Sequence, residues 1–249
     1  MKFNTLIQHL KTGNQALFAV LIDPDKYNPE VVKLAQQHHA ACFLVGGSRL
    51  YSGDLIKTVK HIKTLSKLPV LLFPGDEDQL CPQADGVLLP SLLSGRNAEY
   101  LIGKQVLMAP KIKRMKLPVL SMAYLLFEGK TPSATQQVTQ TGALHLQDLK
   151  TVLDTALAAE MMGFEIVYLE AGSGASAQIP NKVIKAVKKT IRLPLIVGGG
   201  IDSAKKAQDV IKAGANMVVV GNAFEKNVSL IAEIGRCFET KRRPQAKRI

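Results

Sequence analysis

The sequence predicts an α/β protein, a single (β/α)8 or TIM barrel whose third helix is missing or replaced by a loop. Eight short apolar runs alternate with helical patterns, which favours parallel strands joined by right-handed crossovers. The chain has 249 residues, and one such barrel typically needs about 250. Two late runs, which end in residues 198–200 and 221, stop abruptly at glycine. Many barrels form a phosphate site after strands seven and eight in this way.

The predicted strands are apolar without polar alternation, as is typical of strands buried on both faces. They are residues 18–23, 41–46, 69–73, 86–90, 118–122, 165–170, 193–197 and 217–220. The predicted helices are residues 29–39, 50–66, 98–108, 146–162, 181–190, 204–213 and 227–239. The helix at 146–162 is long, and its apolar residues Leu149, Leu153, Leu157 and Met161 are expected on one face.

Two segments depart from the alternation of strands and helices. Residues 74–85 contain two prolines and several acids, so a full crossover helix is not expected between the third and fourth strands. Its absence predicts a groove in the outer ring of helices. Residues 131–141 are rich in Thr, Gln and Ser, and we expect a polar loop there.

Composition narrows the class of protein. No apolar run reaches 18 residues, and the N-terminal segment lacks the apolar core of a signal peptide, so we expect a cytoplasmic protein without a membrane span. The three cysteines are widely spaced, which favours reduced thiols over a disulfide framework or a zinc site. We expect one domain over 1–249, with a basic, mobile tail at 240–249.

The net charge of +12 favours anionic partners such as phosphorylated substrates or an anionic membrane surface. Nucleic acid is not an expected partner, because aromatic residues make up only 5% of the chain and no nucleic-acid-binding motif is present.

Chemistry in this fold takes place at the carboxyl ends of the strands. The first strand ends at Asp23, and the second is followed by Gly46, Gly47 and Ser48. A carboxylate beside a hydroxyl or carbonyl oxygen is a donor set suited to Mg²⁺ and a bound diphosphate. Capping of the first helix by Asp23 or Asp25 is the structural alternative.

The sixth strand ends in Tyr168 and Glu170, which are two residues apart and therefore share a face. A carboxylate inside an apolar barrel is unfavourable without partners. Glu170 is therefore a candidate general base or a stabiliser of developing positive charge. No histidine falls at a strand end, which disfavours histidine-based acid–base catalysis.

Glycines after the sixth, seventh and eighth strands expose backbone N–H groups to an anion. The alternative is that they only form tight strand-to-helix turns. Apolar candidates for a long substrate channel along the predicted groove are Leu92, Leu93, Ala98, Leu101, Ile102 and Tyr124.

Taken together, these motifs resemble the geranylgeranylglyceryl phosphate synthase family, which includes the bacterial heptaprenylglyceryl phosphate synthases. The matching pieces are LIDPDK at 21–26, VGGS at 45–48, VLLPS at 87–91 with Asn97, YLEAGSG at 168–174, VGGGI at 197–201 and VGN at 220–222. Each is weak alone, but they occur in the family's order. Leu21 stands where Bacillus-type members have a lysine, so the resemblance is to the archaeal-like branch and implies a geranylgeranyl donor.

The resemblance implies a Mg²⁺-dependent enzyme that joins sn-glycerol 1-phosphate to geranylgeranyl diphosphate, a polyprenyl diphosphate, through an ether bond and releases diphosphate. It implies metal binding by Asp23 and Ser48 and catalysis by Glu170 and Tyr168. Binding of sn-glycerol 1-phosphate is implied for Tyr168, Leu169, Glu170, Ala171, Gly172, Ser173, Gly174, Gly199, Gly200, Gly221 and Asn222. It also implies a homo-oligomer, either a dimer or a hexamer. A basic enzyme with an apolar substrate also suits peripheral contact with a membrane surface.

Two other functions remain open from the sequence. A phosphosugar isomerase, epimerase or aldolase would use the same phosphate site, but it should show a lysine or a second carboxylate at a central strand end. A non-catalytic scaffold that binds through its basic tail would leave Asp23, Glu170 and the glycine turns unexplained.

Overall fold

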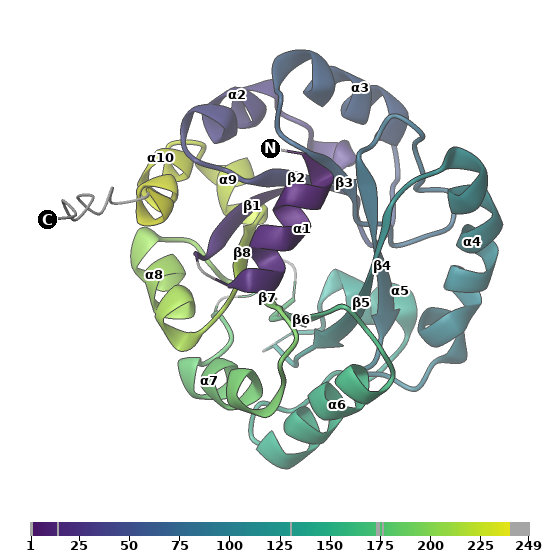
Figure 1. Cartoon of the computed structure of the whole chain (residues 1–249), viewed down its shortest axis with the longest axis vertical. Coiled ribbons are helices and arrows are strands. Elements are labelled where there is room, and N and C mark those ends of the chain that lie inside the picture. The colour runs from purple at the N-terminus through teal and green to yellow at the C-terminus, as the bar shows by residue number, and fades with distance from the viewer. Residues whose placement is uncertain (1, 14, 130, 173–174, 176, 240–249) are drawn as a thin grey trace, which may run out of the picture.

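The computed structural model describes residues 2–13, 15–129, 131–172, 175 and 177–239. Its eight strands are all parallel and close into a barrel in chain order, with β8 paired to β1 (Figure 1). The strands are β1 Leu17–Ile22, β2 Cys42–Val45, β3 Val70–Leu72, β4 Gly86–Leu92, β5 Val119–Leu126, β6 Ile166–Glu170, β7 Leu195–Gly198 and β8 Met217–Val220. The predicted fold is confirmed.

Helices surround the barrel on its outside (Figure 1). The α-helices are α1 Phe3–Thr12, α2 Pro29–Gln37, α3 Leu55–Leu65, α4 Lys104–Met115, α5 Ala134–Thr139, α6 Leu149–Met161, α7 Asn181–Thr190, α8 Ala204–Ala213, α9 Asn222–Lys226 and α10 Leu230–Gly235. Short 3-10 turns η1 Pro24–Lys26 and η3 Arg236–Phe238 and a π-helical turn η2 Glu99–Gly103 complete the set. Each helix within the described residues is too short or too polar to span a lipid bilayer.

No helix connects β3 to β4, as the sequence predicted: residues 73–85 are all described, and none of them is helical. Two ion pairs hold this loop against the next helix, because Lys104 Nζ lies 2.6 Å from both Asp76 Oδ1 and Glu77 Oε2. Lys111 of α4 also donates to the Glu77 carbonyl at 3.1 Å. The acids that argued against a crossover helix thus fasten the loop that replaces it.

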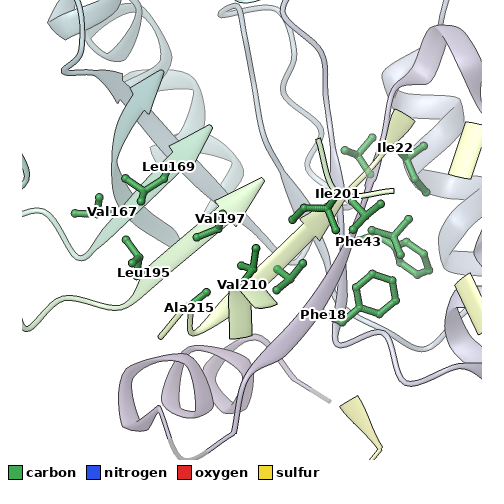
Figure 2. Close-up of a cluster of buried hydrophobic side chains, with 14 of the residues drawn as sticks. Phe18, Ile22, Phe43, Val167, Leu169, Leu195, Val197, Ile201, Val210 and Ala215 are labelled. Atoms are coloured by element: carbon green, nitrogen blue, oxygen red, sulfur yellow. The ribbon is translucent and has the colours of Figure 1, made fainter. Parts of the chain in front are cut away.

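The core has two layers, because successive residues of a strand point to opposite faces. One layer lies between the barrel and the helices, where Phe18, Val167, Leu169, Leu195 and Val197 pack (Figure 2). The other fills the barrel interior and includes residues such as Ala19, Leu44, Ile166 and Tyr168. The predicted inward face shared by Tyr168 and Glu170 follows from this alternation.

The N-terminal helix α1 was not predicted, and it lies across the barrel in Figure 1. Its Leu6 and Leu10 are buried and belong to the interior layer of the core. Phe3 packs so closely on Gly86, at the start of β4, that a side chain at Gly86 would overlap its ring. The helix therefore closes the end of the barrel at which the strands begin.

Several boundaries differ from the sequence predictions. β5 runs four residues beyond 122, because Tyr124, Leu125 and Leu126 pair with β6. Residues 131–141 are not a simple loop: α5 forms there, and the Ser133 and Gln136 side chains cap it reciprocally. The predicted helix at 227–239 is divided between α10 and η3. The basic tail at 240–249 lies outside the described residues.

The apolar stripe predicted for α6 coincides only in part with the face that the helix buries. The helix buries Val152, Ala156 and Ala159, whereas Met161 is exposed. Leu149 and Leu153 of the predicted stripe pack, partly buried, against the same core.

Candidate active site

A cavity of about 650 Å³ opens at the carboxyl ends of the strands, and residues from the ends of all eight strands line it. Eight of the predicted site residues meet there: Asp23, Ser48, Tyr168, Glu170, Gly199, Gly200, Gly221 and Asn222. Leu169 points instead into the layer under the helices, and Ala171 and Gly172 are not on the cavity wall. Ser173 and Gly174 lie outside the described residues.

Glu170 is the buried carboxylate of the cavity, and burial raises its pKa to about 7. The N–H of Gly172 donates to Oε1 at 2.8 Å, and together with the nearby Tyr168 hydroxyl it opposes the effect of burial on the pKa. A carboxyl group that titrates near neutral pH can take a proton from a substrate hydroxyl and release it again.

Three aromatic rings form the wall beside Glu170. The ring centroids of Tyr124 and Tyr168 are 5.3 Å apart, and Phe73 lies 5.5 Å from Tyr168 and 5.9 Å from Tyr124. The Tyr168 hydroxyl is buried and has no hydrogen bond of good geometry to the described residues. Burial raises the pKa values of both tyrosines, so both hydroxyls stay protonated and can donate to a ligand.

Glycines bring the backbone of β7 close to this carboxylate. Gly199 and Gly200 have positive φ angles of 80° and 67°. A Cβ atom at Gly198 would collide with the Tyr168 hydroxyl, and one at Gly199 would collide with Glu170 Oε1. The glycines are therefore required by close approach as well as by backbone conformation, and a ligand can reach the N–H groups that they leave uncovered.

Asp23 and Ser48 lie on adjacent strand ends on the β1–β2 side of the cavity. A Cβ atom at Gly47, next to Ser48, would be 3.5 Å from Asp23 Oδ1. Burial raises the pKa of Asp23, whereas the N–H of Asp25, which donates to Oδ1 at 3.0 Å, lowers it. The predicted capping role is therefore also present.

The donor set fits Mg²⁺ better than a transition metal. The described residues contain no group of three or more His, Cys, Asp or Glu side chains that could hold a metal ion. Mg²⁺ usually binds through one or two protein oxygens together with waters and substrate phosphates. Asp23 with Ser48 offers this arrangement, and the unfavourable burial of the Asp23 carboxylate would be relieved by a cation.

The turn that carries Ser48 is held by a side chain that the sequence did not indicate. Gln79, which is only 1% exposed, accepts hydrogen bonds from Gly47 N and Gly75 N, both at 3.2 Å. Ser48 Oγ lies 3.0 Å from Thr135 Oγ1 of α5. Gln79 and Thr135 are distant from Ser48 in the sequence, so only the closed topology could reveal these contacts.

An apolar part of the cavity extends toward α4, on the side where the third helix is absent. Pro90, Leu92, Tyr100, Met108 and Tyr124 line it. Of the predicted channel residues, Leu92 and Tyr124 are therefore confirmed as lining residues. Leu93, Ala98, Leu101 and Ile102 do not line it, and Ile102 is instead exposed on the outer surface. Leu101 and Ile102 belong to the π-helical turn η2, which was not predicted.

Comparison with known proteins agrees with this geometry. The PcrB family matches residues 11–237. The chain is 43% identical over 217 residues to the geranylgeranylglyceryl phosphate synthase of Zunongwangia profunda, covering 85% of this chain and 92% of that protein. It is 40% identical over 228 residues to the synthase of the same name from Thermococcus sibiricus, covering 89% of this chain and 88% of that protein.

A solved structure shows the same architecture. The (S)-3-O-geranylgeranylglyceryl phosphate synthase of Thermoplasma acidophilum, crystallised with sn-glycerol 1-phosphate, superposes with a TM-score of 0.87 at 32% identity. The alignment covers 96% of this chain and 98% of that one. Both sequence and structure therefore agree over nearly the whole length, and this chain belongs to the PcrB family.

Proposed function

We propose that this protein transfers a prenyl group from a polyprenyl diphosphate to sn-glycerol 1-phosphate, forming an ether and releasing diphosphate. One observation carries the proposal: a single cavity joins a glycine-lined anion site, a buried carboxylate, a pair of oxygen donors and an apolar extension. The anion site suits a small phosphorylated alcohol, and the carboxylate can activate its hydroxyl group. The oxygen donors suit a metal-bound diphosphate leaving group, and the apolar extension suits an isoprenoid chain.

In the proposed reaction, a hydroxyl oxygen of glycerol phosphate attacks C1 of the prenyl donor while the bond from C1 to the diphosphate oxygen breaks. The hydroxyl proton passes to Glu170, whose raised pKa suits a general base near neutral pH. Tyr168 would position the hydroxyl or the glycerol phosphate with its unpaired O–H group. The backbone at Gly199, Gly200 and Gly221 would hold the phosphate.

We further propose that Asp23 and Ser48 hold Mg²⁺ on the diphosphate side. When bound, Mg²⁺ neutralises charge on the leaving diphosphate. Asp23→Asn should weaken Mg²⁺ binding, because this ion prefers carboxylate oxygens to amide oxygens as ligands. Activity should fall by about 10²-fold or more as a result. Titration with Mg²⁺ in the presence of inorganic diphosphate, followed by calorimetry, would measure the binding independently of turnover. Full activity with an unchanged metal response would contradict the assignment.

The transferase assay tests the function itself. Purified protein is incubated with Mg²⁺, labelled sn-glycerol 1-phosphate and polyprenyl diphosphates of graded length, and the dephosphorylated lipid is chromatographed. We expect product with the C20 donor. Product with longer donors alone would keep the reaction and change the chain length, whereas no product from folded protein with any donor would overturn the proposal.

The phosphosugar alternative is not favoured by the cavity. The described lysines on its wall are Lys26, Lys104 and Lys226, and none of them belongs to a strand. Lys104 is held by Asp76 and Glu77, which raise its pKa and disfavour the neutral amine that Schiff-base chemistry needs.

We also propose that the protein forms a homo-oligomer through α4 and the preceding turn. Ile102, Val106 and Leu107 are 62%, 62% and 47% exposed, which gives this helix an apolar outer surface. Val106→Glu should reduce the molar mass measured by light scattering after gel filtration. An unchanged mass would contradict this interface, and loss of vesicle binding at constant mass would assign the surface to a membrane instead.

A further inference from the structure

The diphosphate side of the cavity needs positive charge beyond that of a metal ion. Asp23 already offsets part of the charge of a divalent cation, and the diphosphate of a prenyl donor is strongly anionic. Among the described residues, four basic side chains line the cavity: Lys26, Arg49, Lys104 and Lys226. Which of them is available depends on how each is paired within the protein.

Two of the four are already engaged by carboxylates. Lys26 Nζ lies 3.1 Å from Glu225 Oε2, and Lys104 is bound to Asp76 and Glu77. Among the described residues, neither Arg49 nor Lys226 has a carboxylate partner within ion-pair distance, and both are exposed. Lys226 ends α9 on the side of Gly221 and Asn222, whereas Arg49 directly follows Ser48. Arg49 is therefore the unpaired cation next to the proposed metal site.

The loop that carries Arg49 is held in place by a carboxylate that has no role in the chemistry above. Asp25 accepts hydrogen bonds from the N–H groups of Tyr51 at 2.9 Å and Ser52 at 2.8 Å, and from that of Gly53. These donors lower the pKa of Asp25 and favour its charged form. A Cβ atom at Gly53 would overlap the backbone of Pro24 and Asp25, so the loop lies directly on the η1 turn.

The same loop places an aromatic ring beside the guanidinium group of Arg49. The Arg49 Cζ atom lies 5.8 Å from the centre of the Tyr51 ring, and both side chains are on the cavity wall. Arg49 is itself exposed, and its guanidinium N–H groups donate to none of the described residues, so they are available to a ligand. Guanidinium groups bind phosphate oxygens through two parallel hydrogen bonds, which a lysine cannot reproduce.

We propose that Arg49 binds the diphosphate of the prenyl donor and that Asp25 is a positioning residue that holds the loop carrying it. The inference rests on the proposed transferase function, since it presumes a diphosphate on this side of the cavity. It assigns separate roles to the two aspartates of LIDPDK, which both line the cavity: Asp23 to the proposed metal site, and Asp25 to the order of the neighbouring loop.

The test is binding of inorganic diphosphate in the presence of Mg²⁺, measured by calorimetry. Arg49→Ala should weaken this binding by about 10- to 100-fold, the range expected for a charge-assisted bidentate contact, and should leave the affinity for sn-glycerol 1-phosphate unchanged. Arg49→Lys should restore only part of the loss. The matched control is Lys57→Ala, which removes one positive charge from α3, outside the cavity wall.

A double-mutant cycle tests the role of Asp25. Asp25→Asn should weaken diphosphate binding in the native background and have no further effect in the Arg49→Ala background. Equal losses in both backgrounds would overturn the positioning role, and unchanged binding in Arg49→Ala would overturn the contact itself. Retained sn-glycerol 1-phosphate binding shows that each variant is folded.

Turnover of the wild type separates this inference from the proposed function. A wild type that forms the ether product while Arg49→Ala binds diphosphate normally would refute only the role of Arg49. A wild type that neither turns over a prenyl donor nor binds diphosphate would refute the transferase function as well.

Discussion

Each end of the barrel buries a polar side chain to a similar extent, but the two side chains differ in how completely they are hydrogen-bonded. Asn216, where the strands begin, is 8% exposed, and Glu170, where they end, is 7% exposed. Asn216 Oδ1 accepts hydrogen bonds from Lys188 Nζ at 2.9 Å and Leu195 N at 3.0 Å, and its Nδ2 donates to the Leu10 carbonyl at 3.3 Å. Within the described residues, Glu170 accepts one backbone hydrogen bond, from Gly172, and lies beside an unpaired Tyr168 hydroxyl.

The difference separates stability from function within one fold. At the end closed by α1, the buried polar atoms of Asn216 are hydrogen-bonded within the protein, which stabilises the folded chain. The open end leaves a carboxyl group and a hydroxyl group incompletely paired, and incompletely paired groups are available to a ligand. Substitutions at the first end should therefore change stability, and substitutions at the second should change activity.

The largest effect is expected for Glu170→Gln. The amide keeps the size of the side chain but cannot accept a proton, so turnover should fall by about 10²- to 10⁴-fold, the usual contribution of a general base. Binding of sn-glycerol 1-phosphate, measured by calorimetry, should persist. Turnover equal to that of the wild type would show that Glu170 is not the base.

Although Glu170→Gln should lower turnover, it should raise the stability of the protein at alkaline pH. Because burial raises the pKa of Glu170 from 4.5 to about 7, the native state binds the proton more tightly than the unfolded chain does. Stability from this group is complete below pH 4.5 and falls as pH rises toward 7, by about 3 kcal/mol. Glu170→Gln should therefore unfold at a higher temperature than the wild type at pH 8 but not at pH 4. A difference in unfolding temperature that is the same at pH 4 and at pH 8 would contradict the raised pKa of Glu170.

Gly199→Ala should reduce activity by about 10²-fold, because a misplacement of about 1 Å among reacting groups has effects of this size. Its methyl group would collide with Glu170, in addition to the strain of a φ of 80°. Gly163→Ala is the matched control: its φ is 82°, and no atom lies within 4 Å of the added Cβ. Both variants should lose about 1–2 kcal/mol of stability from strain, but only Gly199→Ala should lose turnover. Equal activities, measured by the transferase assay, would show that the glycine serves backbone conformation alone.

Asn216→Ala should destabilise the protein by about 2–4 kcal/mol, because the buried Leu195 N–H and the partly buried Lys188 ammonium both lose an acceptor. The kcat and KM values should stay within about twofold of the wild type at a temperature where both proteins are folded, because the end of the barrel at which the strands begin lies outside the active site. Urea unfolding measures the first effect and the transferase assay the second. A large change in kcat for a fully folded variant would contradict the separation of the two ends.

The smallest effect is expected for Lys11→Ala, also at the closed end. Lys11 Nζ lies 3.0 Å from Glu165 Oε1, but the two side chains are 50% and 37% exposed. Exposed ion pairs contribute at most about 1 kcal/mol, so the unfolding midpoint should barely move. A loss as large as that of Asn216→Ala would show that burial does not decide the importance of polar contacts at this end.

Much of the fold was predictable, because it depends on local patterns. The strand positions followed from apolar runs, and the loop at 74–85 followed from its prolines and acids. Predictions failed where tertiary contacts override local preference. β5 was extended to Leu126 by pairing with β6. Residues 3–12 carry an amphipathic helical pattern in Phe3, Leu6, Ile7 and Leu10, but the surface that this face covers is the barrel end, which exists only in the folded protein.

The residues of the candidate site were likewise predictable only in part. Strand-end positions pointed to Asp23, Ser48, Tyr168, Glu170 and the glycines, because parallel strands present their carboxyl ends on one face. The residues that support them were not predicted. Gln79 clamps the Ser48 turn, and Phe73 completes the aromatic wall, but each belongs to a loop whose path is set by the closed barrel.

The sequence by itself determined the order of the strands, the groups at their ends and the position of the missing helix. These are properties of segments a few residues long, and hydrophobic periodicity and turn chemistry specify them. The tertiary structure alone decided how strongly Glu170 is buried, which cations remain unpaired and what holds each loop. Burial and pairing depend on residues that are far apart in the chain, such as Asp25 and Gly53 or Gly47 and Gln79, and only folding brings these together.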